Sequence, residues 1–229
     1  MLQIFRVAGI PVRVDASWLL VFALIWFLPD LTPAAAWLDA ATAAALFFAS
    51  VFLHELSHVA VARRNGMRVG SIRLHVFGGV SELPAEPPPR AEFLIAAVGP
   101  LTSLAIAAVC YGLGRTLAGI AWAAALTGYL TAINLIVGLI NLVPGLPLDG
   151  GRLLRAMLWR WSGRVEWATR WAGRAGSLFA VVLIGLGALR AAGGELTGGL
   201  WFIVIGLSLG HAARASVEMA STRDLEHAA

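Results

Sequence analysis

Lysine is absent from this chain of 229 residues, and charged residues of all kinds make up only 13%. That is about half the share found in a soluble domain. Apolar residues account for 59% of the chain, and the mean hydropathy is +0.80. So little charge with so much apolar side chain excludes an ordinary soluble protein and indicates an integral membrane protein.

Cysteine is almost absent as well. The single Cys110 excludes an intrachain disulfide and a zinc site built from several cysteines. The 17 basic residues are all arginines, and they lie between apolar segments rather than in a basic stretch interleaved with aromatic residues. The net charge of +4 therefore predicts no nucleic-acid partner, and the arginines are better interpreted as membrane-topology signals.

Six apolar segments have spanning or near-spanning length. They cover residues 16–28, 40–62, 93–113, 120–143, 175–189 and 200–213. A transmembrane helix needs about 20 residues, so the first, fifth and sixth segments must include flanking residues. We expect an all-α polytopic membrane protein with about six transmembrane helices in a lipid bilayer, forming a single membrane-embedded domain over residues 1–229.

The arginines predict the orientation of these helices. If all six segments span, fifteen arginines fall on one side of the membrane, and only Arg115 and Arg190 fall on the other. Because loops rich in arginine stay in the cytoplasm, we expect both termini to be cytoplasmic, in the plasma or inner membrane of the cell.

Three connections between the segments have a character of their own. Residues 69–80 alternate in part and end at Gly78-Gly79, which predicts a short strand with a tight turn, hence a small membrane-associated hairpin. Prolines at positions 84, 87, 88 and 89 predict a stiff, non-helical linker. A Pro- and Gly-rich stretch at 144–151 ends the fourth segment, and such backbone is tolerated near membrane depth only inside protein or beside water.

The second segment contains an H-E-x-x-H pattern at His54, Glu55 and His58. Histidines at i and i+4 share one face of a helix, so both imidazoles can hold one zinc ion. Glu55 lies about 100° round the helix. There it is poorly placed to chelate but able to act as general base on a water. Three ionisable residues in an apolar span need a functional reason, although two histidines bonded to neighbouring polar groups remain an alternative.

A catalytic zinc ion keeps three protein ligands and one open position. The longer pattern that adds a third histidine fails, because Val61 and Arg64 stand at its glycine and histidine positions. Glu82 and Glu86 lie in the proline-rich linker. Asp149, among glycines at the broken end of the fourth segment, is the best candidate for the third ligand. The alternative for Asp149 is a turn or N-cap residue.

Both motifs together resemble those of the site-2 protease family of intramembrane zinc metalloproteases. The second motif, N-x-x-P-x-x-P-x-D-G-G, is complete within Asn141–Arg152, and Gly99-Pro100 and Phe77-Gly78-Gly79 are similar to further family features. The resemblance implies one zinc ion per chain and cleavage of a peptide bond within or near a transmembrane helix of a membrane-protein substrate. The chain departs from the larger members of that family, because neither a PDZ-like insertion nor nucleotide-sensing repeats are evident, and we therefore expect a minimal member.

Weaker predictions concern substrate binding. Asn141 is a candidate to hydrogen-bond the substrate backbone or a developing oxyanion, with a hydrogen bond between helices as the alternative. The strand ending at Gly78 and Gly79 is expected to pair with an unwound substrate, with a simple surface hairpin as the alternative. Pro144, the first proline of the second motif, is a further candidate. A catalytically silent scaffold that binds substrate helices and a metal-ion transporter remain as alternative functions. Assembly into a homo-oligomer is left open.

Overall fold

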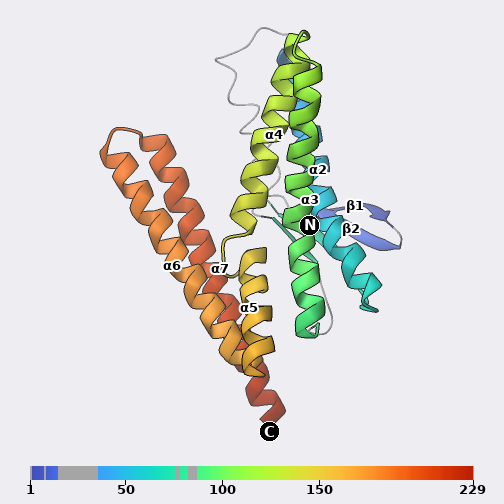
Figure 1. Cartoon of the computed structure of the whole chain (residues 1–229). Helices are drawn as coiled ribbons and strands as arrows, with labels where there is room; N and C mark the ends of the chain where they lie inside the picture. The colour runs from blue at the N-terminus through green and yellow to red at the C-terminus, as the bar shows by residue number, and fades with distance from the viewer. Residues whose placement is uncertain (1, 8, 15–35, 76–77, 82–86, 229) are drawn as a thin grey trace. The chain divides into compact units, whose positions relative to one another are not determined.

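The computed structural model describes residues 2–7, 9–14, 36–75, 78–81 and 87–228 (Figure 1). Within these residues, five helices are long and apolar enough to cross a membrane. Their spanning stretches are Ala41–Arg64, Pro89–Thr116, Ala121–Asn141, Val165–Ala192 and Leu196–Glu218. The mostly helical, multi-pass architecture is therefore confirmed. The first expected span, residues 16–28, lies outside the described residues.

The helices extend beyond the apolar segments. Their bounds are α2 Ala36–Arg64, α3 Pro89–Thr116, α4 Ala121–Asn141, α6 Val165–Ala192 and α7 Leu196–Ala228. The short fifth and sixth segments thus gain their length from polar flanking residues. One prediction about the linker was wrong, because α3 begins at Pro89 itself. Proline is well suited to the first position of a helix, where the amide hydrogen that it lacks would have no intrahelical acceptor.

The structure also contains a helix that the hydropathy pattern did not predict, α5 (Asp149–Ser162). It lies in the arginine-rich connection between the fourth and fifth apolar segments, and its 14 residues are too polar and too few to span a membrane. The helix ends at Gly163, whose φ of 70° is left-handed. The Gly163 amide donates to the carbonyl of Trp159 at 2.8 Å, which satisfies one carbonyl of the last turn.

The predicted hairpin is half of a larger sheet. Strands β3 (Ile72–His75) and β4 (Gly78–Ser81) pair antiparallel, as expected for a hairpin. The expected tight turn at Gly78-Gly79 was wrong, because both glycines belong to β4 and pair with His75 and Leu74. Two unpredicted strands near the N-terminus, β1 (Leu2–Val7) and β2 (Ile10–Val14), complete a sheet of order β1-β2-β3-β4. The β2–β3 pairing is parallel, with Val12 opposite Ile72. Local alternation could not predict it, because parallel strands are joined through a long intervening segment.

The sheet packs against α2. Ile10 and Val12 of β2 are buried together with Val59 of α2. Partly buried apolar residues surround this core: Val7, Phe47, Phe48, Val51, Phe52 and Val69. The half of α2 that carries the histidine motif is therefore held by the sheet rather than surrounded by lipid alone.

The described chain divides into two compact units, formed by residues 1–87 with 98–139 and by residues 88–97 with 140–229. In the first unit, α4 packs on α3 through Gly138, where an added Cβ would lie 2.9 Å from Leu104 Cγ and 3.3 Å from the Pro100 carbonyl. Near the other end of this helix pair, a Cβ added to Gly114 of α3 would lie 2.9 Å from the hydroxyl of Thr127 in α4. Small residues thus allow close helix packing at both ends.

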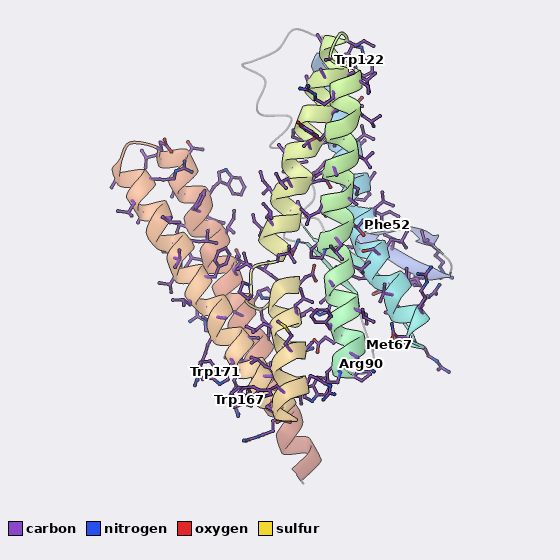
Figure 2. All side chains as sticks on the ribbon, viewed as in Figure 1. Phe52, Met67, Arg90, Trp122, Trp167 and Trp171 are labelled. Atoms are coloured by element: carbon purple, nitrogen blue, oxygen red, sulfur yellow. The ribbon has the colours of Figure 1, made fainter. Side chains whose placement is uncertain are left out.

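In the second unit, α6 and α7 form a helical hairpin (Figure 1). Their close approach depends on Gly187 and Gly206, because an added Cβ at either would come within 2.9 Å of the opposite helix. At the start of α6, the ring centroids of Trp167 and Trp171 are 6.0 Å apart (Figure 2). The ring of Trp161, near the end of α5, lies 6.5 Å from that of Trp167. The guanidinium of Arg174 lies 5.1 Å from the centroid of Trp171. Such aromatic and arginine side chains are typical of a membrane–water interface.

Candidate metal centre

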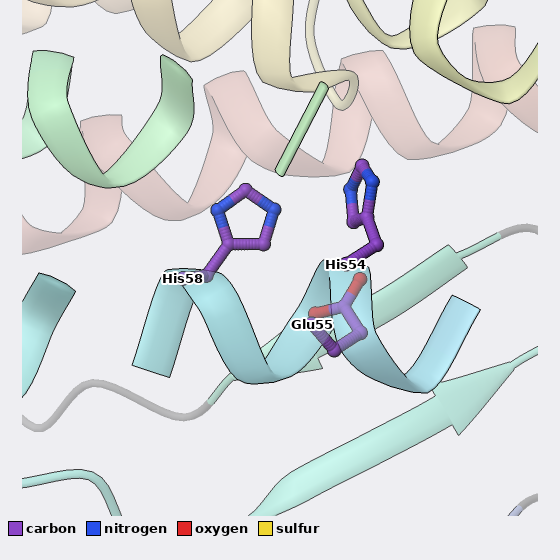
Figure 3. A group of neighbouring side chains, drawn as sticks. All are labelled: His54, Glu55 and His58. Carbon is purple, nitrogen blue, oxygen red and sulfur yellow. The ribbon is translucent and has the colours of Figure 1, made fainter. Parts of the chain in front are cut away.

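Helix α2 brings together the first three predicted site residues. His54, Glu55 and His58 are each only 4% exposed. One potential ligand atom from each residue lies within 4.8 Å of the others. Figure 3 shows both imidazoles rising from the same side of α2, with the Glu55 carboxylate beside them. The ring centroids of the two histidines are 4.9 Å apart and the ring planes are at 75°. The helical spacing therefore produces the compact cluster that the motif predicts.

Helix α3 approaches this cluster through Gly99. A Cβ added at Gly99 would lie 2.6 Å from Nε2 of His54 and closer still to Nε2 of His58. Both Nε2 atoms thus face the same point on α3, where only a residue without a side chain leaves room for them. This explains physically why glycine stands at position 99 next to Pro100.

One turn further along α3, Ser103 contacts the cluster. Its hydroxyl oxygen lies 2.9 Å from Nδ1 of His54, and Ser103 is 1% exposed. With Nδ1 engaged by Ser103, the Nε2 atom of His54 faces the glycine. The site is therefore lined by two helices, with the imidazoles on α2 and a glycine and a hydroxyl on α3.

The donor set fits a zinc ion. Two buried imidazoles present their Nε2 atoms toward one point, a carboxylate lies beside them, and the second nitrogen of His54 has a hydrogen-bond partner. Zinc sites in proteins have this composition, and their histidine ligands usually bond an outer group through the other ring nitrogen. The alternative of two histidines bonded only to neighbouring polar groups does not account for nitrogens that converge on a glycine.

Asp149, the predicted third ligand, belongs to the second unit. It is the first residue of α5 and is 8% exposed. The N-cap position is occupied by Leu148, whose side chain makes no capping hydrogen bond. The alternative role of Asp149 as an N-cap residue is therefore wrong. A carboxylate in the first turn still benefits from the helix dipole, and its ligation of a metal stays a prediction.

The loop before Asp149 is held by backbone contacts. The amide of Leu146 donates to the carbonyl of Ala172 in α6 at 3.0 Å. An added Cβ at Gly176 would meet the Leu146 carbonyl, and one at Gly145 would lie 2.5 Å from the Gly176 Cα. Likewise, a Cβ at Gly150 would meet the backbone of the preceding turn. The glycines of this motif thus allow the loop to fold against α6 and against itself.

The weaker predicted residues occupy defined positions in α4, in the turn after it and in β4. Asn141 is the last residue of α4 and is partly buried, and Pro144 is exposed in the turn that follows. Gly78 and Gly79 begin β4, where they pair with His75 and Leu74. Their roles toward a substrate stay predictions.

Ser103 was not among the predicted site residues. A usable signal was present, because position 103 is one helical turn beyond Gly99 and shares its face of α3. Serine is common in membrane helices for other reasons, so the spacing alone did not distinguish a residue of the site.

Residues 42–128 and 115–183 match peptidase family M50. The chain belongs to this family. The matched stretch begins in α2 and ends in α6, and it includes both motifs. Membership in M50 supports a peptidase, and it agrees with the resemblance to site-2 proteases drawn from the motifs.

Individual relatives agree with this assignment. Rip3 of Mycobacterium tuberculosis, whose name marks it as a candidate zinc metalloprotease, is 43% identical over 96% of this chain. A zinc metalloprotease of Methanocaldococcus jannaschii is 31% identical over 82% of the chain. The chain spans 59% and 54%, respectively, of the lengths of these two proteins. The solved structure of a site-2 protease from M. jannaschii is similar with a TM-score of 0.72 and 27% identity, covering 94% of each chain.

Proposed function

We propose that this M50 chain is an intramembrane zinc protease that hydrolyses a peptide bond within or near a transmembrane helix of a membrane-protein substrate. One observation carries the proposal. His54 and His58 lie in the spanning helix α2, and their Nε2 atoms face one point on α3. The carboxylate of Glu55 lies beside them. Ionisable groups at this depth are costly unless they serve a function.

In this proposal His54, His58 and Asp149 hold one zinc ion per chain. The metal, when bound, supplies a Lewis acid that polarises a carbonyl and acidifies a water. Glu55 then accepts a proton from the attacking water and delivers it to the nitrogen of the leaving amine. Asn141 is the candidate for hydrogen bonding to the substrate or to the developing oxyanion. Since a scaffold needs no base, the burial of Glu55 beside the histidines argues against a catalytically silent role.

The sheet offers a way to hold the substrate. A helix buries its own scissile carbonyls in hydrogen bonds, so a substrate must unwind before attack. Among the described strands, β4 lies at an edge of the sheet, and it packs against α2, which carries the catalytic motif. We propose that the unwound substrate adds to β4 as a further strand beside Gly78 and Gly79.

The arginines suggest the orientation of the protease. We propose that the whole chain acts as one membrane-embedded domain, with both termini and the active site toward the cytoplasm. The exposed Arg170 and Arg174 beside the tryptophans at the start of α6 agree with a cytoplasmic interface there.

The test uses Glu55→Gln, which removes the base but keeps the size of the side chain. Wild-type and variant protein would be purified in detergent and incubated with zinc and a panel of single-span membrane proteins, and new peptide termini would be identified by mass spectrometry. We expect one zinc per chain in both proteins and a loss of cleavage on the order of a thousandfold or more in the variant.

The matched control is Glu195→Gln, which makes the same change at an exposed residue of the α6–α7 connection. It should cleave like the wild type. Retained cleavage by Glu55→Gln would reject its role as base, and a wild-type protein without zinc would reject the metal site.

A further inference from the structure

We propose that Ser103 is a positioning residue, which holds the His54 imidazole in the orientation that turns Nε2 toward Gly99 and the proposed metal. The inference rests on the proposed zinc site and adds a residue from a different helix to it. Its observation is the 2.9 Å contact between Ser103 Oγ and His54 Nδ1 across α3 and α2.

The orientation of the His54 ring determines which of its two nitrogens must carry the proton when a metal binds. Nε2 of His54 faces Gly99, where Nε2 of His58 also lies, so Nε2 is the atom through which both rings would hold a metal. A neutral imidazole carries its proton on one nitrogen and a lone pair on the other. Metal binding through Nε2 therefore requires the proton on Nδ1. Ser103 Oγ then accepts the hydrogen bond that Nδ1–H donates.

The contact between Ser103 and His54 lies in a buried part of the protein. Ser103 and His54 are 1% and 4% exposed, so the ring cannot replace a lost partner with bulk water. Inside a protein an unsatisfied donor is more costly than in water, and a satisfied one is more strongly held. Removing an outer partner of a metal-binding histidine typically costs 10- to 100-fold in metal affinity.

Other buried hydroxyls of the spanning helices bond differently. Ser50 donates to the carbonyl of Phe47 at 2.7 Å, and Thr127 donates to that of Ala123 at 2.7 Å. Both bonds stay within one helix, as is usual for serine and threonine in membrane helices. Ser103 instead bonds a side chain that is 49 positions away in the sequence. Its contact therefore constrains a functional ring rather than its own backbone.

Gly99 explains why a residue as short as serine reaches the ring. Because Gly99 has no side chain, α3 comes close enough for the imidazoles to lie against its backbone. Position 103 is one turn away on the same face. Glycine and serine thus form a pair, in which the first makes room for the metal-binding nitrogen and the second holds the opposite nitrogen.

The experiment compares Ser103→Ala with Ser103→Thr, which keeps the hydroxyl, and with Ser50→Ala as a matched control. Ser50 is 5% exposed and lies one turn before His54 on α2. The zinc dissociation constant of the full chain in detergent would be measured by competition with a chelator. We expect a rise of about 10- to 100-fold for Ser103→Ala, recovery of most of that loss in Ser103→Thr, and no more than a roughly twofold change in Ser50→Ala.

A second measurement does not depend on zinc. In metal-free protein labelled with ¹⁵N-histidine, the chemical shift of His54 Nδ1 reports whether this nitrogen is hydrogen-bonded. We expect a hydrogen-bonded Nδ1 in the wild type and in Ser103→Thr, and loss of that hydrogen bond in Ser103→Ala. A wild-type Nδ1 without a hydrogen bond, or zinc binding by Ser103→Ala within about twofold of the wild type, would overturn the inference.

Equal losses in Ser103→Ala and Ser50→Ala would also overturn it, because they would indicate a general packing effect. A wild-type protein that binds no zinc at all would instead reject the proposed function. The ring measurement would still decide the role of Ser103 in that case.

Discussion

Glycines serve different purposes at the two motifs of this M50 chain. At Gly99, in the first unit, the space of a missing Cβ is occupied by the ring nitrogens of His54 and His58. At Gly176 and Gly150, in the second unit, the corresponding space is occupied by backbone carbonyls. One region is therefore built from side chains that face a glycine, and the other from main chain that lies against glycines.

The difference determines what a substitution should break. A side chain can rotate away from an added methyl group, so the helix survives while the function of that side chain is lost. A backbone carbonyl cannot move without shifting the loop that carries it, so an added methyl group strains the fold itself. Three predictions test this comparison, from the largest expected effect on stability to the smallest.

The largest effect is expected for Gly176→Ala in α6. The new Cβ would collide with the Leu146 carbonyl and separate the Asp149 loop from the helix. We expect the free energy of unfolding to fall by about 3 kcal/mol or more, with part of the protein aggregating. Thermal and denaturant unfolding in detergent would measure the loss.

Gly185→Ala is the matched control on the same helix. An added Cβ at Gly185 meets nothing within 4 Å, so this change should be neutral or slightly stabilising through the better helix propensity of alanine. Equal stability of the two variants would refute the idea that the loop is locked by its backbone.

An intermediate effect is expected for Glu92→Gln. Glu92 at the start of α3 is fully buried and accepts from Nε of Arg155 in α5 at 2.8 Å, with a second bond from Nη2. Removing one charge of a buried pair leaves the other uncompensated, and we expect a cost of about 3 kcal/mol. The same unfolding measurements apply.

The exposed pair of Arg190 with Glu195 gives the contrast. Glu195→Gln should cost less than about 1 kcal/mol, since both side chains remain in contact with solvent. If Glu92→Gln were equally mild, α5 would depend on its backbone contacts alone.

The smallest effect on stability, yet a large one on function, is expected for Gly99→Ala. The methyl group would displace both Nε2 atoms, while alanine favours the helix. We expect the free energy of unfolding to change by no more than about 1 kcal/mol. We expect the zinc affinity to fall on the order of 100-fold. Metal analysis together with unfolding would separate the two quantities.

Gly112→Ala on the same helix meets nothing within 4 Å and should leave both quantities unchanged. A Gly99→Ala protein that unfolds as readily as Gly176→Ala would erase the difference between the two regions.

Much of the architecture followed from local pattern. The apolar segments from residue 40 onward correspond to spanning helices. The β3–β4 hairpin was predicted from its alternation, although the glycines expected in its turn lie in β4. The sequence pattern did not predict the elements whose structure depends on packing or on a strand partner. Helix α5 is too polar to be found by a hydropathy criterion. Strands β1 and β2 are defined by their pairing within the four-stranded sheet.

The sequence by itself determined the membrane class and the His54, Glu55 and His58 cluster. Both depend on short-range periodicity, because a spanning helix must satisfy its own backbone and positions i and i+4 share a face. Only the tertiary structure decided that Gly99 makes room for the two Nε2 atoms and that Ser103 contacts His54. Those contacts depend on how α3 is rotated against α2, which is a property of packing that no local spacing encodes.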